Sequence, residues 1–287
     1  MSRPPTFTPP PGTRAHRLRT ARGDFAAITG EPADGPVRGT VLLLPGFTGS
    51  KEDFIALHGP LSAAGYRTVA VDGRGQYESA GPAHDEAPYA QAELARDVLA
   101  QVAALGVGRV HLLGHSLGGL VARAAVIADP APFASLTLMA SGPAAVTEPQ
   151  QQRLKLLRDA LTALDMAQVW EAIQALDAPE DAADVRGDGA ELRRRWMLNS
   201  PAQLIATGRQ LCDEPDRVAE LAAVAPPVHV VSGERDDTWP LPLLDAMAAR
   251  LGAGRSVIAG AEHSPNTDRP LETAAALAAF WDLHPTA

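Results

Sequence analysis

The segment Gly114-His115-Ser116-Leu117-Gly118 has the residue types and spacing most able to do chemistry. It matches the pattern G-x-S-x-G, and it lies directly after a short apolar run and directly before a helical pattern. This context places the serine on a strained turn between a strand and a helix. A Cβ atom at Gly114 or Gly118 would collide with the neighbouring strand or helix, so glycine is required at both positions. We therefore predict that Ser116 is a nucleophile.

A serine hydroxyl is a weak nucleophile at neutral pH, so it needs an adjacent base and a group that orients the base. Three histidines follow Ser116. His229 lies inside an apolar run and His284 lies near the end of the chain. His263 instead follows the apolar run 255–258 in a loop, and functional sites gather where such strands end. His263 is therefore the predicted base.

The group that orients the base should come from the loop after the preceding apolar run. Its role is to accept the Nδ1 proton of His263, to fix the tautomer and to stabilise the imidazolium that forms. We take Asp236 for this role. The residue types alone leave Glu234 and Asp237 as alternatives, and a carboxylate in such a loop is otherwise a solvated residue or a helix N-cap.

Six short apolar runs end at a glycine or a polar cluster, which is typical of strands buried on both faces of a parallel sheet. They cover residues 40–44, 66–71, 110–113, 136–139, 228–231 and 255–258. Helical patterns alternate with them at residues 54–64, 89–105, 117–128, 241–251 and 271–283. This alternation predicts an α/β fold with a doubly wound, mostly parallel sheet. Residues 18–30 are expected to add one or two edge strands.

The alternation is interrupted between residues 143 and 225, where apolar residues recur three or four positions apart. This spacing predicts several amphipathic helices. We expect residues 143–225 to form a helical cap or lid over the site, and residues 17–142 and 226–287 to form the core. Five prolines in residues 1–11 disfavour both helix and sheet, so residues 1–16 are expected to be a mobile tail.

The composition of the chain limits the kinds of partner that we expect the protein to bind. Twenty-five Lys and Arg against 34 Asp and Glu give a net charge of −9 over 287 residues, so we expect no nucleic-acid partner. Cys212 is the only cysteine, so the chain has no pair of cysteines for a disulfide or for a structural zinc site, and we expect neither a disulfide nor a metal site. We find neither an apolar leader nor a run of about 18 apolar residues, so we expect no membrane span and a cytoplasmic location.

Four segments, taken in order, make the chain resemble the α/β-hydrolase-fold serine hydrolases, a superfamily of esterases and lipases. The segments are Leu44-Pro45-Gly46-Phe47-Thr48-Gly49, the turn 72–75, the motif 114–119, and the loops that carry the acid and the histidine. The resemblance covers residues 18–283. It implies the α/β-hydrolase fold with the lid inserted after the sixth strand, and it implies a catalytic triad of Ser116, His263 and Asp236.

The resemblance also implies an oxyanion hole made by the backbone N–H groups of Phe47 and Leu117. It implies that Ser116 attacks an ester or related acyl carbonyl and forms an acyl-enzyme that water hydrolyses, with no cofactor. The partner would be a small-molecule acyl substrate with an apolar portion. The sequence does not indicate the oligomeric state.

Substrate identity is less well determined, because it depends on side chains from the lid and the loops. The candidate pocket residues are His115, Trp170, Trp196, Met197 and Trp239. For the tryptophans, a core position on a helical stripe is the stronger alternative. Two segments also depart from many relatives, which have His-Gly in place of Pro45-Gly46 and Gly-His in place of Glu262-His263. These departures weaken the transfer of a substrate class.

Two other functions remain open at this stage. A lyase-like or C–C bond-cleaving enzyme of the same fold, acting in a biosynthetic pathway, would turn over without an acyl-enzyme. A catalytically inert ligand-binding member would not react covalently at all. A haloalkane dehalogenase or epoxide hydrolase is disfavoured, because those relatives place Asp where this chain has Ser116.

Overall fold

The computed structural model describes residues 3–32, 35–177 and 188–286. Within them eight strands form one sheet in the order β1-β2-β4-β3-β5-β6-β7-β8, and β3 to β8 run parallel to one another. The strands are β1 (Thr13–Thr20), β2 (Gly23–Gly30), β3 (Gly39–Leu44), β4 (Tyr66–Val71), β5 (Val110–His115), β6 (Phe133–Met139), β7 (Val228–Gly233) and β8 (Gly254–Ile258). The six predicted core strands are all present, and residues 18–30 supply the end of the edge strand β1 and the whole of β2, which runs antiparallel to both β1 and β4.

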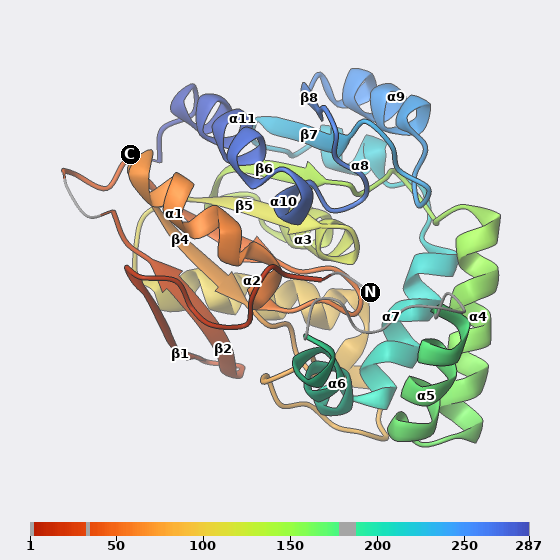
Figure 1. The fold of residues 1–287 in the computed structure, drawn as a ribbon. Coiled ribbons are helices and arrows are strands. Elements are labelled where there is room, and N and C mark those ends of the chain that lie inside the picture. Colours follow the sequence, from red (N-terminus) through yellow and green to blue (C-terminus); the bar gives the residue numbers. More distant parts are fainter. Residues whose placement is uncertain (1–2, 33–34, 178–187, 287) are drawn as a thin grey trace.

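Helices cover both faces of the sheet, which explains why the central strands are apolar along their whole length (Figure 1). One face packs against α1 (Ile55–Ala63) and α11 (Pro270–Asp282), and the other packs against α2 (Gln91–Leu105), α3 (Leu117–Ala128) and α9 (Leu241–Leu251). Shorter helices are η1 (Lys51–Phe54), η2 (Ala87–Tyr89) and α10 (Pro265–Asp268). No helix in the described ranges is both long and apolar enough to cross a membrane.

Among the described residues, five helices lie between β6 and β7, in the segment predicted as a lid. They are α4 (Glu148–Ala163), α5 (Met166–Asp177), α6 (Gly189–Leu198), α7 (Pro201–Asp213) and α8 (Val218–Ala222). Helices α4 to α7 stand together at one end of the sheet in Figure 1. They share an apolar cluster that includes Leu161, Trp170, Trp196 and Leu204. Helix α8 packs against α3 and α9 instead. Residues 178–187 of the predicted lid lie outside the described residues.

The N-terminal segment is more structured than the sequence predicts. Strand β1 already begins at Thr13, so the prediction of a tail up to residue 16 was wrong for its last four residues. Ahead of the strand, the ring of Phe7 lies edge-on to Tyr77, with the ring centroids 6.4 Å apart, and the Arg195 guanidinium lies over the Phe7 ring. The prolines exclude regular structure but leave Phe7 free to pack. Residues 1 and 2 of the predicted tail are outside the described residues.

Three buried histidines lie in the sheet and on α1, remote from the loops that carry Ser116 and His263. In each of them one ring nitrogen forms a hydrogen bond with a hydroxyl group. The pairs are His58 with Thr68 at 2.6 Å, His111 with Ser135 at 2.8 Å, and His229 with Ser256 at 2.8 Å. The other ring nitrogens have no hydrogen-bond partner among the described residues. Burial lowers the pKa of each imidazole from 6.5 to about 4.

Stability should therefore fall as the pH is lowered from about 6.5 to about 4. The unfolded chain binds protons at these rings in this window while the folded chain does not, so each ring lowers the free energy of unfolding by roughly 1.4 kcal/mol per pH unit. Urea unfolding at about pH 7.5 and about pH 5 measures the loss. An unchanged free energy would contradict the burial of neutral rings. His229→Gln, which removes one titrating ring, should show a shallower dependence.

Candidate active site

Ser116 occupies the turn between β5 and α3, with φ 53° and ψ −119°. A non-glycine residue rarely adopts such a positive φ, so the surrounding structure must hold it there. A Cβ atom on Gly114 would lie 2.2 Å from the Gly118 carbonyl oxygen, and one on Gly118 would lie 2.4 Å from the Leu44 carbonyl oxygen. Both glycines are therefore required for close packing, as the sequence predicts.

The structure brings Ser116, His263 and Asp236 together. His263 Nε2 lies 3.1 Å from Ser116 Oγ, and His263 Nδ1 lies 3.0 Å from both carboxylate oxygens of Asp236. The Asp236 side chain is fully buried, whereas that of His263 is 28% exposed. Because a carboxylate can only accept, Nδ1 carries the proton and Nε2 is the ring atom free to accept the hydroxyl proton of Ser116.

Backbone groups hold Asp236 in its orientation. Its Oδ1 accepts hydrogen bonds from the N–H groups of Thr238 at 2.8 Å and Trp239 at 3.1 Å. The two alternative carboxylates face elsewhere. Glu234 accepts from the N–H of Gly260 at 2.9 Å, and Asp237 is 71% exposed and accepts from the side chain of Gln150 at 2.7 Å. Of the three candidates, Asp236 is the one that contacts His263.

The acid and histidine loops approach one another closely because β7 and β8 are paired neighbours. Gly233 ends β7, and a Cβ atom there would lie 2.2 Å from the carbonyl oxygen of Glu262 and 2.4 Å from that of Ala261. These residues directly precede His263. The N–H of Glu234 also donates to the Ala261 carbonyl at 3.0 Å. The absence of a side chain at Gly233 thus sets the distance between the two loops.

The two predicted oxyanion donors lie on either side of Ser116. Leu117 is the next residue in the chain, and Phe47 is in the loop after the neighbouring strand β3. Leu117 opens helix α3, and Phe47 follows β3, which pairs with β5 so that Leu44 lies beside Gly114. Neither N–H donates to a protein acceptor within the described part of the chain. The N-terminus of α3 adds a positive partial charge at Leu117. The arrangement leaves two backbone donors for a negative oxygen.

A cavity of about 330 Å³ opens beside Ser116 and His263. The core contributes Gly46, Phe47, Thr48, Gly49, His115, Ser116, Asp237, Thr238, His263 and Ser264, and the segment between β6 and β7 contributes Val146, Gln150, Arg153, Leu154 and Leu211. The lining is thus both polar and apolar. The described residues include no group of three or more His, Cys, Asp or Glu side chains that could hold a metal ion.

His115 lines this cavity, with its ring held against the histidine loop. Its Nε2 donates to the His263 carbonyl oxygen at 2.8 Å. Burial, followed by the neighbouring His263, lowers the pKa of the His115 imidazole from 6.5 to about 4. At neutral pH His115 is therefore an uncharged ring that supports the loop of His263.

The other four predicted pocket residues do not line the cavity, and that prediction is corrected. Trp170 and Trp196 belong to the apolar cluster of the inserted helices. Met197 borders a separate surface groove. Trp239 is fully buried, and its Nε1 donates to the Ala144 carbonyl at 2.8 Å. Large aromatic side chains on helical stripes are more valuable for packing than for lining a small cleft.

Sequence reasoning missed the residues of α4 that do line the cavity, Gln150, Arg153 and Leu154. Their helical spacing predicts an amphipathic helix, but it does not reveal which of its faces meets the core. Sequence reasoning also gave no role to Gln76, which directly follows the recognised turn 72–75 and whose side chain contacts the carbonyls of Gly46 and Phe47. Its position in the loop gave no sign of its contacts.

Comparison with known proteins identifies the class. The model of the alpha/beta hydrolase family matches residues 41–276, and the chain belongs to this family. The pimeloyl-[acyl-carrier protein] methyl ester esterase of Edwardsiella ictaluri (strain 93-146) is 30% identical over 260 residues, which are 81% of this chain and 94% of that protein. The predicted fold is confirmed, and the chain is a hydrolytic enzyme.

Two further proteins resemble this chain, one over a short segment and the other over almost its whole length. A protein of Variovorax paradoxus (strain S110) that bears the name "Putative carbamate hydrolase RutD" is 44% identical over 108 residues, which are only 38% of this chain and 39% of that protein. The crystal structure of a hydrolase from Pseudomonas aeruginosa PA01 superposes with a TM-score of 0.74 at 24% identity, covering 93% of this chain and 98% of that chain. This structural likeness supports the fold alone.

Replacing Gly233 by Ala should lower hydrolytic activity by about 100-fold. The added Cβ displaces the residues before His263, and a misplacement of about 1 Å costs on the order of this factor. Steady-state rates on an activated ester measure the effect. Gly59→Ala on α1 is the matched control, because a Cβ there meets nothing within 4 Å. Equal activity of the two variants would show that the close approach at Gly233 does not position His263.

Proposed function

We propose that this protein is a serine hydrolase that cleaves a carboxylic ester or a related acyl bond through an acyl-enzyme. One observation carries the proposal: Ser116 Oγ, His263 Nε2 and the Asp236 carboxylate form a continuous chain of contacts of 3.0 to 3.1 Å at the edge of a cavity. The related esterase, which acts on a methyl ester, supports the choice of an ester bond.

In this mechanism His263 takes the proton of Ser116 as the oxygen attacks the acyl carbonyl. Asp236 holds the Nδ1 proton and stabilises the imidazolium. The imidazolium then gives its Nε2 proton to the departing alcohol, which leaves the acyl group on Ser116. Water then attacks the acyl carbon as His263 takes its proton, the bond from the acyl carbon to Ser116 Oγ breaks, and the imidazolium returns the proton to Ser116 as the acid leaves. Because Asp236 is buried and held by two backbone N–H groups, its carboxylate keeps one orientation throughout.

The N–H groups of Phe47 and Leu117 would stabilise the tetrahedral oxyanion. They come from the loop after β3 and from the N-terminus of α3, and these two segments pack on one another at Gly118, so the relative position of the two donors is fixed before substrate binds. Such preorganised donors avoid the cost of reorienting solvent, and each contributes on the order of 100- to 1000-fold to the rate.

The cavity favours a small or medium acyl substrate with an apolar portion. Phe47, Val146 and Leu154 offer apolar contact, while Arg153 brings a cation to the same cavity. Arg153 is 73% exposed and lies 3.9 Å from Asp237, an ion pair too loose to exclude another anion. We propose that the cavity accepts an acyl chain with a polar or anionic group, and that α4 and α7 form the cap that encloses it.

Rapid mixing with a p-nitrophenyl ester should give a burst of about one p-nitrophenolate per protein, followed by slower turnover. Intact mass taken during turnover should show the acyl adduct, and Ser116→Ala should give neither signal. Turnover without a burst or an adduct would favour the lyase-like chemistry of the same fold. Equal turnover by the folded Ser116→Ala variant would reject the proposed nucleophile.

A further inference from the structure

Gln76 joins two loops that meet behind the proposed oxyanion hole. Gln76 is buried, with 5% of its surface exposed. The Nε2 group donates to the Gly46 carbonyl oxygen at 2.8 Å and approaches that of Phe47 at 3.3 Å, while Oε1 accepts from the Gly73 N–H at 2.9 Å. Because two carbonyls and one N–H surround it, only one orientation of the amide satisfies all three contacts. Gln76 therefore occupies one defined position.

The carbonyl of Gly46 and the N–H of Phe47 belong to one peptide group. That group is planar and trans, so the direction of the carbonyl fixes the opposite direction of the N–H. Gln76 thus holds the plane that carries one of the two proposed oxyanion donors. The Gly49 N–H, at 3.1 Å, donates to the same carbonyl oxygen from within the loop. Hydrogen bonds to the carbonyl also polarise the peptide and strengthen its N–H as a donor.

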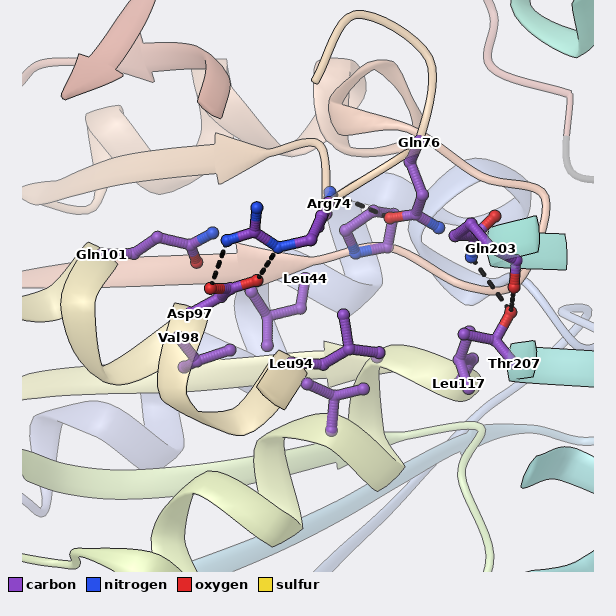
Figure 2. Close-up of a pocket in the computed structure, with 14 residues that line it drawn as sticks. Leu44, Arg74, Gln76, Leu94, Asp97, Val98, Gln101, Leu117, Gln203 and Thr207 are labelled. Carbon is purple, nitrogen blue, oxygen red and sulfur yellow. Dashed lines mark hydrogen bonds and ion pairs between the residues drawn. The ribbon is translucent and has the colours of Figure 1, made fainter. Parts of the chain in front are cut away.

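Gln76 lies on the far side of this peptide from the substrate. It lines a second cavity, of about 40 Å³, which shares no lining residue with the cavity beside Ser116 (Figure 2). Pro45 borders the second cavity, and Gly46 and Phe47 border the first. The segment 45–47 therefore separates the two, and Gln76 reaches it from behind without a place in the substrate cavity.

The turn that carries Gln76 is itself held by a charged pair. Arg74 donates to both carboxylate oxygens of Asp97 on α2, at 2.6 Å each, and Figure 2 shows this pair beside Gln76. A Cβ atom on Gly73 would lie 2.6 Å from Gln76 Oε1, so the turn also leaves exact room for the amide. Asp97 on α2 thus holds the turn through Arg74, and the turn in turn holds Gln76 against the loop that carries Phe47.

We propose that Gln76 is a positioning residue that aims the Phe47 N–H at the oxyanion of the acyl-transfer reaction. The inference rests on the proposed function, because it assigns a role within that mechanism. It predicts that losing the Nε2 donor slows the chemical step and leaves substrate binding largely unaffected.

The test uses Gln76→Glu, which keeps the shape and removes the donor at neutral pH, and Gln76→Met, which removes it without placing a charge in the interior. Gln203→Met is the matched control. Gln203 is 2% exposed and lines the same second cavity, but its Nε2 donates to Thr207 and not to the loop 45–47. All variants are first compared with the wild type by thermal unfolding.

The readout is kcat and KM for an ester and for the matching thionoester, whose sulfur is a poor hydrogen-bond acceptor. For the ester we expect kcat of both Gln76 variants to fall by about 10- to 100-fold with KM changed less than about threefold. The thionoester rate should fall much less, so the ratio of the two rates collapses. Gln203→Met should keep the wild-type ratio.

Several outcomes overturn the proposal. They are a folded Gln76 variant with wild-type kcat, an equal fall for ester and thionoester, and failure of both Gln76 variants to fold, which would make Gln76 a structural residue only. Ser116→Ala separates these from failure of the proposed function. If that variant hydrolyses the ester as fast as the wild type, the acyl-transfer mechanism fails, and the role of Gln76 fails with it.

Discussion

The site depends on backbone segments that approach one another more closely than side chains would permit. Strands β3, β5, β7 and β8 are parallel and end at the same edge of the sheet, so the loops that follow them converge. Glycines at 114, 118 and 233 remove the Cβ atoms that would keep these loops apart. Ser116 accepts a strained backbone conformation as a consequence, and the packing around it pays for that strain.

Buried ion pairs tie the inserted helices to this scaffold. Arg123, on the helix that follows Ser116, contacts Glu214 at 2.6 Å and donates to the carbonyls of Gly142 and Pro143. It thereby holds both ends of the segment that carries α4 to α7. Arg195 on α6 contacts Asp53 at 2.8 Å, with both side chains fully buried. Such pairs add little net stability, but losing one partner costs about 3–5 kcal/mol, so they favour one placement of the helices.

Much of this arrangement can be predicted from the sequence because it follows from local rules. Apolar runs that end at glycine predict the parallel strands, and a serine between two glycines after such a run predicts the turn at Ser116. Asp236 and His263 lie in loops whose place follows from the strand order. These predictions do not require knowing which helices and loops pack against one another in the folded protein.

The cavity beside Ser116 and the residues that support it depend on contacts between distant segments, and these contacts could not be predicted from the sequence. From the sequence, Trp170 and Trp196 are candidate pocket walls with a core position as the stronger alternative, and the structure places both in the apolar cluster of the inserted helices. Arg153 lines the cavity only because α4 presents that face to the core. Phe7 packs on Tyr77 although the prolines around it suggest a free tail. In each case the packing partner is far away in the sequence.

The central claim is that Ser116 is activated by His263 and Asp236, and covalent labelling by a fluorophosphonate tests it most directly. The rate of labelling, followed by intact mass, should be high in the wild type and in Glu234→Gln, whose side chain faces away from His263. It should fall by about 1000-fold or more in Asp236→Asn and vanish in Ser116→Ala. Labelling of Asp236→Asn at the wild-type rate, or of Ser116→Ala at all, would contradict the account.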